Sequence, residues 1–270
     1  MDEIYDYNKQ RWAALGRAKA IFTRPWLDLD AASVRERVDP WNLLGDLSGK
    51  KLLCLAGGGG QQSAAFALLG ASVTVFDISD EQLAQDQEAA RHYGLEIATH
   101  QGDMRDLSIF QDHSFDLVWQ PYSINFVPDC RVVFNQVSRI IRPGGLYHFM
   151  IANPFACGMG TRDWNGEGYL IRRQYIDGAE ITYEDEAWVF RDSQAKQEQI
   201  SSPREYRQTL ERILNGLVEH NFIMLKMVDR AGHTQNLEAQ PGAWDHFTSF
   251  LPPWFWFWTL YRPDVTVPEN

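Results

Sequence analysis

The 270-residue sequence has little of several features that define whole classes of protein. Its three cysteines, Cys54, Cys130 and Cys157, are widely spaced and form no C-x-x-C pair, which argues against a disulfide framework and against the common zinc and redox motifs. No run approaches the roughly 20 apolar residues of a membrane span. The start, Met1 to Asp6, is acidic where a secretory signal is cationic. We therefore expect a cytoplasmic protein with no membrane partner.

Positive charge is scarce as well. The chain has 25 Lys and Arg residues against 36 Asp and Glu, a formal charge of −11, and no Lys/Arg run offsets this excess. Such a surface repels a nucleic-acid backbone, so we expect no nucleic-acid partner. The seven histidines form no H-E-x-x-H motif or close pair, so no metal site is predicted. The acidic balance argues against polyanionic partners and indicates no particular partner, and the sequence leaves the oligomeric state open.

Aromatic residues, in contrast, are plentiful. The chain has ten tryptophans, and all but Trp119 lie outside residues 51–152. Either they pack a small second layer or they line a pocket, because binding pockets are commonly lined by aromatic side chains. Both readings stay open at this point.

Between residues 50 and 152, short apolar or β-branched runs alternate with segments of helical periodicity. This rhythm is typical of a parallel sheet covered by helices on both faces. The predicted strands are Lys51–Ala56, Ser72–Asp77, Leu95–His100, Phe115–Gln120 and Gly145–Ile151, and the predicted helices are Gln61–Leu69, Glu81–Tyr93 and Val132–Ile141.

After Asn153 the pattern changes. A Gly-rich and aromatic segment runs to about residue 185 and precedes a predicted amphipathic helix over Pro203–Glu219. Phe222–Val228 and the aromatic run Trp254–Tyr261 are predicted as a sixth and a seventh strand.

Four consecutive glycines, Gly57 to Gly60, connect the first predicted strand to the following helix. Glycines let a ligand approach the backbone closely, and the start of a helix offers free N–H groups. Asp77 ends the second strand, 20 positions after Gly57, where an acidic side chain can accept hydrogen bonds from a ribose diol. This combination predicts a nucleoside ligand.

A dinucleotide fingerprint would need a small residue at the third glycine position. The two possible registers place Gln62 or Ser63 there, and no Lys-Ser/Thr pair follows the glycines to make a P-loop. A nucleoside without pyrophosphate fits better, although an NAD(P)-dependent oxidoreductase stays as the alternative. Ser79 and Gln82 have the spacing of a capping box at the start of the next helix.

Further motifs follow in order along the chain: Val73–Ser79 with its terminal acid, Gln101–Leu107, Ser114–Trp119 and Arg139–Gly145. Together with the glycine-rich turn they resemble class I S-adenosylmethionine-dependent methyltransferases, in particular bacterial enzymes acting on small molecules. Two positions depart from the family pattern, because Cys54 stands where an acidic residue is frequent and Ala56 stands at the first glycine.

The resemblance implies an α/β, Rossmann-like, doubly wound sheet of seven mostly parallel strands, with an antiparallel last strand and an aromatic-rich cap. It divides the chain into an N-terminal helical lid over residues 1–49 and a methyltransferase domain over residues 50–270. Within this domain, residues 153–202 would form an insertion that caps the substrate.

The resemblance also implies that S-adenosylmethionine is the cofactor. By this similarity Ala56, Gly58 and Gly60 approach the methionine portion, Asp77 holds the ribose, Ile78 packs against adenine, Asp103 accepts from the adenine amino group and Met104 lies near the ring. The full set of implied cofactor-binding residues is Ala56, Gly57, Gly58, Gly60, Gln61, Asp77, Ile78, Gln82, Asp103, Met104 and Gln120.

Methyl transfer from a sulfonium is an in-line displacement that depends mainly on alignment and on exclusion of water, so a catalytic base is optional. Tyr122, in the loop after the fourth strand, and His148 and His246 are the catalytic candidates that the expected pocket favours. A protein that binds the cofactor but has lost transfer is the non-enzymatic alternative.

Four arginines in or near the insertion either pair with an acceptor carboxylate or form ordinary ion pairs within the protein: Arg172, Arg173, Arg204 and Arg207.

Overall fold

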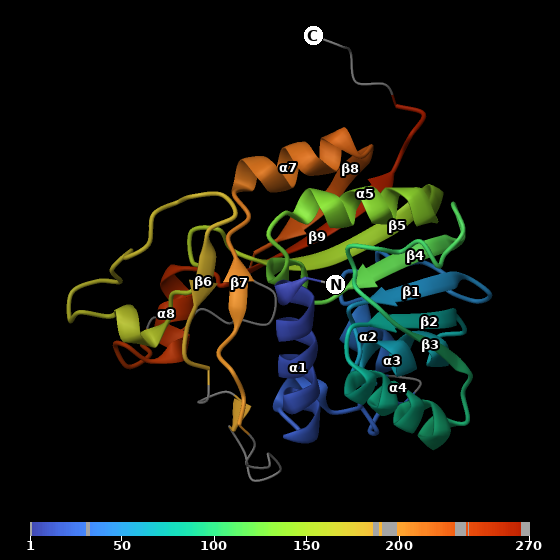
Figure 1. Cartoon of the computed structure of the whole chain (residues 1–270), viewed down its shortest axis with the longest axis horizontal. Helices are drawn as coiled ribbons and strands as arrows, with labels where there is room; N and C mark the ends of the chain where they lie inside the picture. Colours follow the sequence, from blue (N-terminus) through green and yellow to red (C-terminus); the bar gives the residue numbers. More distant parts are fainter. Residues whose placement is uncertain are drawn as a thin grey trace.

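The structure is a computed structural model, and it describes residues 2–30, 33–185, 189–190, 199–229, 236 and 238–265. Its centre is a seven-stranded sheet of order β3-β2-β1-β4-β5-β9-β8 (Figure 1). The strands are β1 (Lys51–Leu55), β2 (Ser72–Asp77), β3 (Ile97–Gln101), β4 (Phe115–Gln120), β5 (Ile141–Ala152), β8 (Phe222–Val228) and β9 (Trp254–Tyr261).

Strands β1 to β5 pair in parallel, whereas β9 runs antiparallel to both β5 and β8. This topology confirms the predicted Rossmann-like sheet with its antiparallel last strand. A separate two-stranded antiparallel ribbon is formed by β6 (Glu180–Thr182) and β7 (Arg204–Tyr206). Among the described residues, no helix is long and apolar enough to cross a membrane.

The described helices are α1 (Glu3–Arg17), α2 (Val34–Val38), α3 (Gln62–Leu68), α4 (Asp80–Tyr93), α5 (Cys130–Ile140), α7 (Leu210–Glu219) and α8 (Trp244–Phe250). Short 3-10 turns lie at Ile21–Thr23, Ile124–Phe126 and Thr161–Asp163. In Figure 1, α1 lies between α4 and the β6–β7 ribbon, and α8 lies beside β6. Helix α1 therefore stands between the sheet domain and the segment that follows β5.

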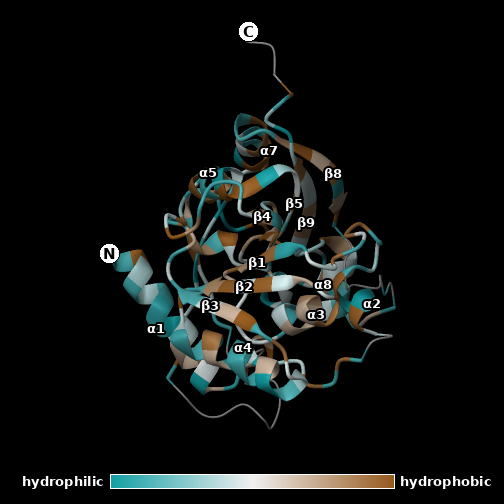
Figure 2. Ribbon diagram, turned by 90° about the vertical axis from the view of Figure 1, so that its right-hand side faces the viewer, coloured by the Kyte–Doolittle hydropathy of each residue, from teal (hydrophilic) through white to brown (hydrophobic). Residues whose placement is uncertain are grey.

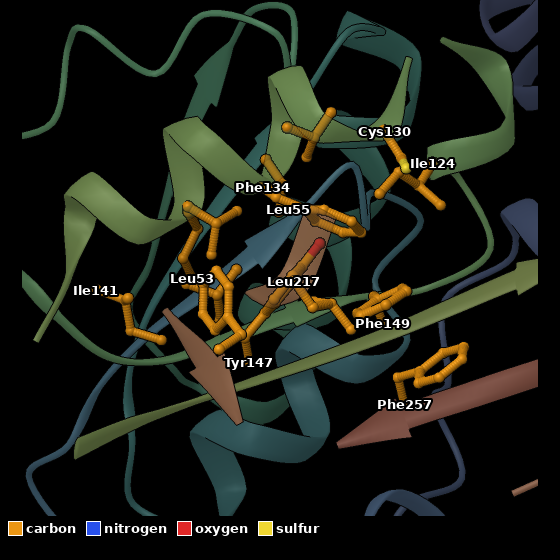
Figure 3. Packing of buried hydrophobic residues seen from close by; sticks show 14 of the residues in the cluster. Leu53, Leu55, Ile124, Cys130, Phe134, Ile141, Tyr147, Phe149, Leu217 and Phe257 are labelled. Carbon is orange, nitrogen blue, oxygen red and sulfur yellow. The ribbon is translucent and has the colours of Figure 1, made fainter. Parts of the chain in front are cut away.

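Alternation along β1 sends its side chains into two separate cores, because successive residues of a strand point to opposite faces. Leu53 and Leu55 pack with α5 and α7 on one face, where Phe134 and Leu217 are also buried (Figure 3). The other face carries Leu52 and Cys54 under α2, α3 and α4. In Figure 2 hydrophobic colour runs along the strands, whereas much of α1 and α4 is hydrophilic. Both faces of the sheet are thus covered, as the near-continuous apolar strands predicted.

Helix α4 begins and ends as its sequence indicates. The Ser79 hydroxyl accepts a hydrogen bond from the Gln82 backbone N–H, and Gly94 closes the helix with a φ of 66°. The reciprocal half of the capping box is absent, because the Gln82 side chain donates instead to the Trp12 carbonyl, at 3.1 Å. This contact joins α4 to α1.

The predicted helix over Pro203–Glu219 is wrong in its first half. Arg204 to Tyr206 form strand β7, and the helix begins only after Thr209, whose hydroxyl accepts from the Arg212 N–H. The apolar spacing is helical from Leu210 onward, but the backbone before it pairs with β6 and so takes an extended conformation. Tertiary pairing overrides the local pattern here.

Strand β5 begins at Ile141, four residues before its predicted start at Gly145. The pairing with β4 shifts between Phe115 and Leu117, and Gly144 has a φ of 78°, so the Pro-Gly-Gly segment forms an irregularity inside the strand. The predicted glycine turn is present, but it lies within the pairing and not before it.

Several tryptophans outside residues 51–152 pack against the sheet. Trp258 is fully buried beside Trp119, and Trp26 and Trp41 cover the same core. Trp12 of α1 stands edge-on to Phe126, at 5.5 Å between ring centroids. These residues pack inside the protein, but against the main sheet and the loop after β4 and not in a separate second layer. Trp188 lies outside the described residues.

Candidate active site

The glycine-rich turn after β1 is a tightly packed loop. Gly59 and Gly60 have φ values of 119° and 69°, and a Cβ on Gly58 would lie 2.6 Å from the Gln82 Cβ. Only glycine fits such a conformation and such a close approach. Ala56 has a φ of 46° despite its Cβ, so the residue that departs from the family pattern still adopts the left-handed backbone that glycine favours.

A buried carboxylate on α4 anchors this turn. Asp86 accepts hydrogen bonds from the backbone N–H groups of Gly59 and Gly60, each at 3.1 Å, and from the Ser63 hydroxyl. Burial raises the pKa of Asp86 to about 7, partly offset by these hydrogen bonds. Sequence reasoning missed Asp86, although a carboxylate on the same helix face as Leu83 and Ala90 was an available signal.

Asp77, at the end of β2, also faces the turn. One carboxylate oxygen accepts from the Gly58 N–H at 2.9 Å and the other from the Ser79 N–H at 3.0 Å. Burial raises its pKa to about 6, and the backbone N–H groups act in the opposite direction. The structure therefore brings the glycine turn and the predicted ribose acid together at the carboxyl edge of the sheet.

The loops after β3 and β4 complete this edge. Asp103 pairs with Arg105, which also pairs with Asp2 at the start of α1. Gln120 is buried and donates to the Met104 sulfur, at 3.2 Å, and to the Ser123 hydroxyl. Predicted cofactor residues from two neighbouring loops are thus in direct contact.

The remaining predicted cofactor residues surround the turn. Gly57 leaves no free space for a side chain, since its Cβ would lie 3.3 Å from Pro121. Gly60 packs against α4 and Pro25, and the Gln61 side chain donates to the Arg24 carbonyl. Ile78 is half-buried between Asp77 and the start of α4. These contacts fix the turn against the N-terminal segment as well as against the sheet.

Helix α1 covers the edge that these loops form. Its Asn8 side chain donates to the Phe126 carbonyl, and the Tyr5 hydroxyl accepts from Gln101, which ends β3. Three buried polar atoms of α1 and α4 have no partner within the described part of the chain: Asn8 Oδ1, Arg11 Nε and Gln82 Oε1. Of these, Gln82 Oε1 lies beside the glycine turn, and an unpaired buried acceptor there fits a polar nucleoside ligand.

Tyr122, a predicted catalytic residue, belongs to a polar cluster that connects this edge to β7. Its hydroxyl donates to Glu205 at 2.7 Å, and the Tyr183 hydroxyl donates to the other Glu205 oxygen at 2.6 Å. The Cys157 sulfur lies 3.9 Å from Glu205. Burial raises the pKa of the Glu205 carboxyl, while the two hydroxyls and Arg11 lower it. No local pattern indicated Glu205, because its partners are distant in sequence.

The two predicted histidines lie elsewhere. His148 is buried in the aromatic core between Trp119 and Trp258, where its Nδ1 contacts the Phe257 carbonyl and burial lowers its pKa to about 3. A neutral, enclosed imidazole of this kind packs the sheet, which argues against a catalytic role. His246 of α8 accepts or donates at the Tyr169 hydroxyl, 2.8 Å away. No hydrogen bond or ring contact among described residues connects Tyr122, His148 and His246 with one another.

Comparisons with known proteins agree with this geometry. Residues 53–149 match a family described as methyltransferase domain. The Bacillus subtilis (strain 168) protein described as uncharacterized methyltransferase YbaJ is 32% identical over 186 residues, which cover 69% of this chain and 71% of that protein. A ubiquinone biosynthesis O-methyltransferase of Pseudomonas syringae pv. tomato is 34% identical over 108 residues, 40% of this chain and 47% of that enzyme.

Among solved structures, an S-adenosylmethionine-dependent methyltransferase from Mesorhizobium loti has the same fold, with a TM-score of 0.60 and 20% sequence identity over 87% of this chain and 100% of that one. The chain belongs to the class I S-adenosylmethionine-dependent methyltransferases. It is a methyltransferase, and S-adenosylmethionine is its cofactor. The alternative of a nicotinamide-dependent oxidoreductase is set aside.

Proposed function

We propose that this methyltransferase acts on a small-molecule acceptor and aligns it with the methyl donor beneath α1. The observation that carries the proposal is the covering of the carboxyl edge by two other segments: Asn8 of α1 bonds to the Phe126 carbonyl, and Tyr122 bonds to Glu205 of β7. The strongly acidic composition also disfavours polyanionic substrates. Relatives described as ubiquinone biosynthesis O-methyltransferases support a small acceptor.

In the proposed site, the cofactor lies against the glycine turn. The Asp77 carboxylate would accept hydrogen bonds from the ribose hydroxyls in place of the one it accepts from the Gly58 N–H. Asp103 would accept from the adenine amino group, and Ile78 would pack against the adenine ring. The unpaired atoms of Asn8 and Gln82 would supply further polar contacts from above. Bound S-adenosylmethionine supplies an activated methyl group on a sulfonium, so no strong acid or base is needed to form the leaving group.

Residues of the chain would position the acceptor, exclude water from the cofactor and take up the proton that the acceptor releases. Helix α1 would exclude solvent from the cofactor loops, which favours a displacement in which the positive charge of the sulfonium is dispersed and a neutral thioether leaves. Tyr122 stands in the loop after β4 with its hydroxyl bonded to Glu205, and it is the proposed contact for the acceptor. A proton released by an oxygen or nitrogen acceptor could pass to the Tyr122–Glu205 pair, since burial raises the pKa of the Glu205 carboxyl.

Incubation of the protein with isotopically labelled S-adenosylmethionine and a whole-cell extract, which contains small molecules, proteins and nucleic acids, tests this function. Mass spectrometry is expected to find the label in a low-molecular-weight product, and label found only in protein or nucleic acid would refute the proposal. Cofactor binding by calorimetry in the same preparation separates an inactive binding protein from a misfolded one.

The role of α1 as a lid is open to a separate test. Asn8→Ala removes a helix contact to Phe126 and an unpaired oxygen without touching the glycine turn, so we expect weaker cofactor binding and slower transfer. Gln10→Ala changes an exposed residue of the same helix and serves as the matched control. Equal cofactor affinity in both variants would contradict a lid role for α1.

A further inference from the structure

One buried side chain stands between helix α1 and the glycine turn. Gln82, in the first turn of α4, is only 2% exposed. Its backbone is held on both sides, because its N–H donates to the Ser79 hydroxyl and its carbonyl accepts from the Gly59 N–H at 3.2 Å. The Gln82 backbone is therefore fixed against the glycine turn.

Glycines on either side make room for this side chain. A Cβ on Gly58 would lie 2.6 Å from the Gln82 Cβ, which is too short for two carbon atoms. A Cβ on Gly16 of α1 would lie 3.4 Å from Gln82 Nε2 and 3.0 Å from the Glu81 Cβ. Helix α1 and the turn approach α4 this closely because neither position carries a side chain. Gln82 thus contacts α1 and the glycine turn at the same time.

The two ends of the Gln82 amide differ in their partners. Nε2 donates to the Trp12 carbonyl of α1 at 3.1 Å, whereas Oε1 is buried and has no hydrogen-bond partner among the described residues. A reversed amide would place Oε1 against the Trp12 carbonyl oxygen, and because two acceptors repel, this carbonyl fixes the orientation. Oε1 lies 3.4 Å from the position of a Cβ on Gly59. The unpaired acceptor therefore lies beside the turn.

An unpaired buried acceptor costs free energy, which a hydrogen-bond donor brought to the same place recovers. The carboxylate of Asp77 and the Gln82 side chain both approach Gly58, since a Cβ there would lie 3.0 Å from Asp77 Oδ2. A ligand held by Asp77 is thus close to Gln82. S-adenosylmethionine brings two kinds of donor, the ribose hydroxyls and the ammonium group of its methionine portion.

We propose that Gln82 couples cofactor binding to the docking of α1: Oε1 accepts a hydrogen bond from a hydroxyl or ammonium donor of the cofactor, while Nε2 holds the Trp12 carbonyl. The proposal rests on the proposed function, which places the cofactor against the glycine turn beneath α1. A donor on Oε1 keeps the amide in the orientation that holds α1, and it strengthens the Nε2 hydrogen bond by polarising the amide. The coupling is reciprocal, so a docked α1 also retains the cofactor. Gln82 is a positioning residue and takes no part in the transfer step.

Hydrogen–deuterium exchange on the full-length protein tests the coupling. We expect saturating S-adenosylhomocysteine, the product form of the cofactor, to slow exchange about 5-fold or more both in residues 56–68 and in α1. Gln82→Met nearly keeps the length of the side chain but removes both of its hydrogen bonds. This variant should bind S-adenosylhomocysteine at least about 5-fold more weakly by calorimetry. At saturation the ligand should still protect residues 56–68 of the variant but leave α1 unprotected.

The matched control is Gln87→Met, the same substitution on the same helix. Gln87 donates to the Ile97 carbonyl of β3 at 2.9 Å, away from the turn, so affinity and protection of α1 should stay unchanged. Unchanged affinity in Gln82→Met, or full protection of α1 in that variant at saturation, would overturn the coupling.

Smaller ligands on the unaltered protein identify the donor, and they decide the proposal even where Gln82→Met fails to fold. 5′-Methylthioadenosine has the ribose hydroxyls but no ammonium group, and 2′,3′-dideoxyadenosine has neither. Each is compared at a concentration that protects residues 56–68 equally. Protection of α1 by S-adenosylhomocysteine and methylthioadenosine assigns the donor to the ribose, and protection by S-adenosylhomocysteine alone assigns it to the ammonium group. Equal protection of α1 by the dideoxynucleoside would overturn the proposal.

Failure of this inference is distinguishable from failure of the proposed function. S-adenosylhomocysteine that protects residues 56–68 but not α1 in the unaltered protein overturns the coupling and leaves the proposed function standing. Labelled methyl found only in protein or nucleic acid refutes the small-molecule acceptor, whatever the exchange of α1 shows.

Discussion

The cofactor-binding half and the cap are held together by different kinds of contact. Around the glycine turn, buried carboxylates bond to backbone N–H groups, as Asp77 does with Gly58 across 19 positions of sequence and Asp86 with Gly59 across 27. The predicted cap, residues 153–202, and the strand β7 that follows it rely in their described parts on side-chain pairs between distant segments, as Tyr122 with Glu205 across 83 positions and Arg11 with Asp185 across 174. Contacts between neighbouring elements can leave a sequence signal, as Asp77 does, whereas side-chain pairs between distant segments leave almost none.

The attachment of the cap to α1 gives the largest expected effect. Arg11 and Asp185 form a buried ion pair, with both side chains at most 6% exposed. Arg11→Ala removes the guanidinium from beside the buried Asp185 carboxylate, so the free energy of unfolding should fall by about 3–5 kcal/mol in chemical denaturation. The matched control is Arg204→Ala, because Arg204 pairs with the 82%-exposed Glu3 of the same helix and should contribute about 1 kcal/mol or less. Similar losses of unfolding free energy in the two variants would show that the buried ion pair contributes no more to stability than the exposed one.

The second-largest expected effect is a pH dependence of folding stability, caused by a buried carboxylate of the cofactor-binding half. Folding raises the pKa of Asp86 to about 7, above the usual value of 3.8, so the folded protein holds a proton that the unfolded chain releases. The stabilisation from this group is complete below pH 4 and is lost as the pH rises toward 7. Since one pKa unit corresponds to about 1.4 kcal/mol, the change amounts to about 2–4 kcal/mol.

Thermal unfolding between pH 4 and pH 8 measures this effect in the protein and in Asp86→Asn, whose amide does not titrate. As the pH rises, the melting temperature of the unaltered protein should fall relative to that of Asp86→Asn. Parallel curves would mean that Asp86 has the same pKa in the folded and unfolded states.

Cofactor affinity provides a smaller, more local test of the same half. Asp77→Ala should weaken S-adenosylmethionine binding by about 1.5–3 kcal/mol, the usual contribution of a charge-assisted hydrogen bond, as measured by calorimetry. Asp116→Ala is the control, because Asp116 lies near the amino end of β4 and bonds to Lys51 and Arg142 at the opposite edge of the sheet. An unchanged dissociation constant for Asp77→Ala would show that Asp77 does not bind the ribose of the cofactor.

The smallest effect is expected at Ala56. Its φ of 46° is strained for a residue with a Cβ, so Ala56→Gly should raise the free energy of unfolding by about 0.5–1 kcal/mol despite the greater freedom of the unfolded chain. Denaturant titration measures the change, and Ala67→Gly, within α3, should shift stability in the opposite direction. Destabilisation by Ala56→Gly would contradict this expectation, because it would mean that packing of the Ala56 methyl group contributes more free energy than the backbone strain removes.

Prediction from sequence succeeded where the pattern is local. The seven strands of the sheet follow from runs of apolar residues, and the start of α4 follows from Ser79. It failed at Arg204–Tyr206, which carry helical spacing but pair with β6. For the site, sequence indicated Asp77 and the glycines, and it indicated Tyr122 but gave no sign of Glu205. His148 lies in the aromatic core because β9 brings Trp258 beside it, a pairing that no local pattern announces.

The sequence by itself determined the sheet, the glycine turn and the class of cofactor, because period-two and period-3.6 apolar patterns and positive-φ glycines act over a few residues. Only the tertiary structure decided which polar groups meet. Within the described residues it paired Arg172 and Arg204 with carboxylates, whereas Arg173 and Arg207 donate to backbone carbonyls, although all four are equally charged in the sequence. Charge is a property of one residue, whereas neutralisation depends on which distant residues the fold places within hydrogen-bonding distance.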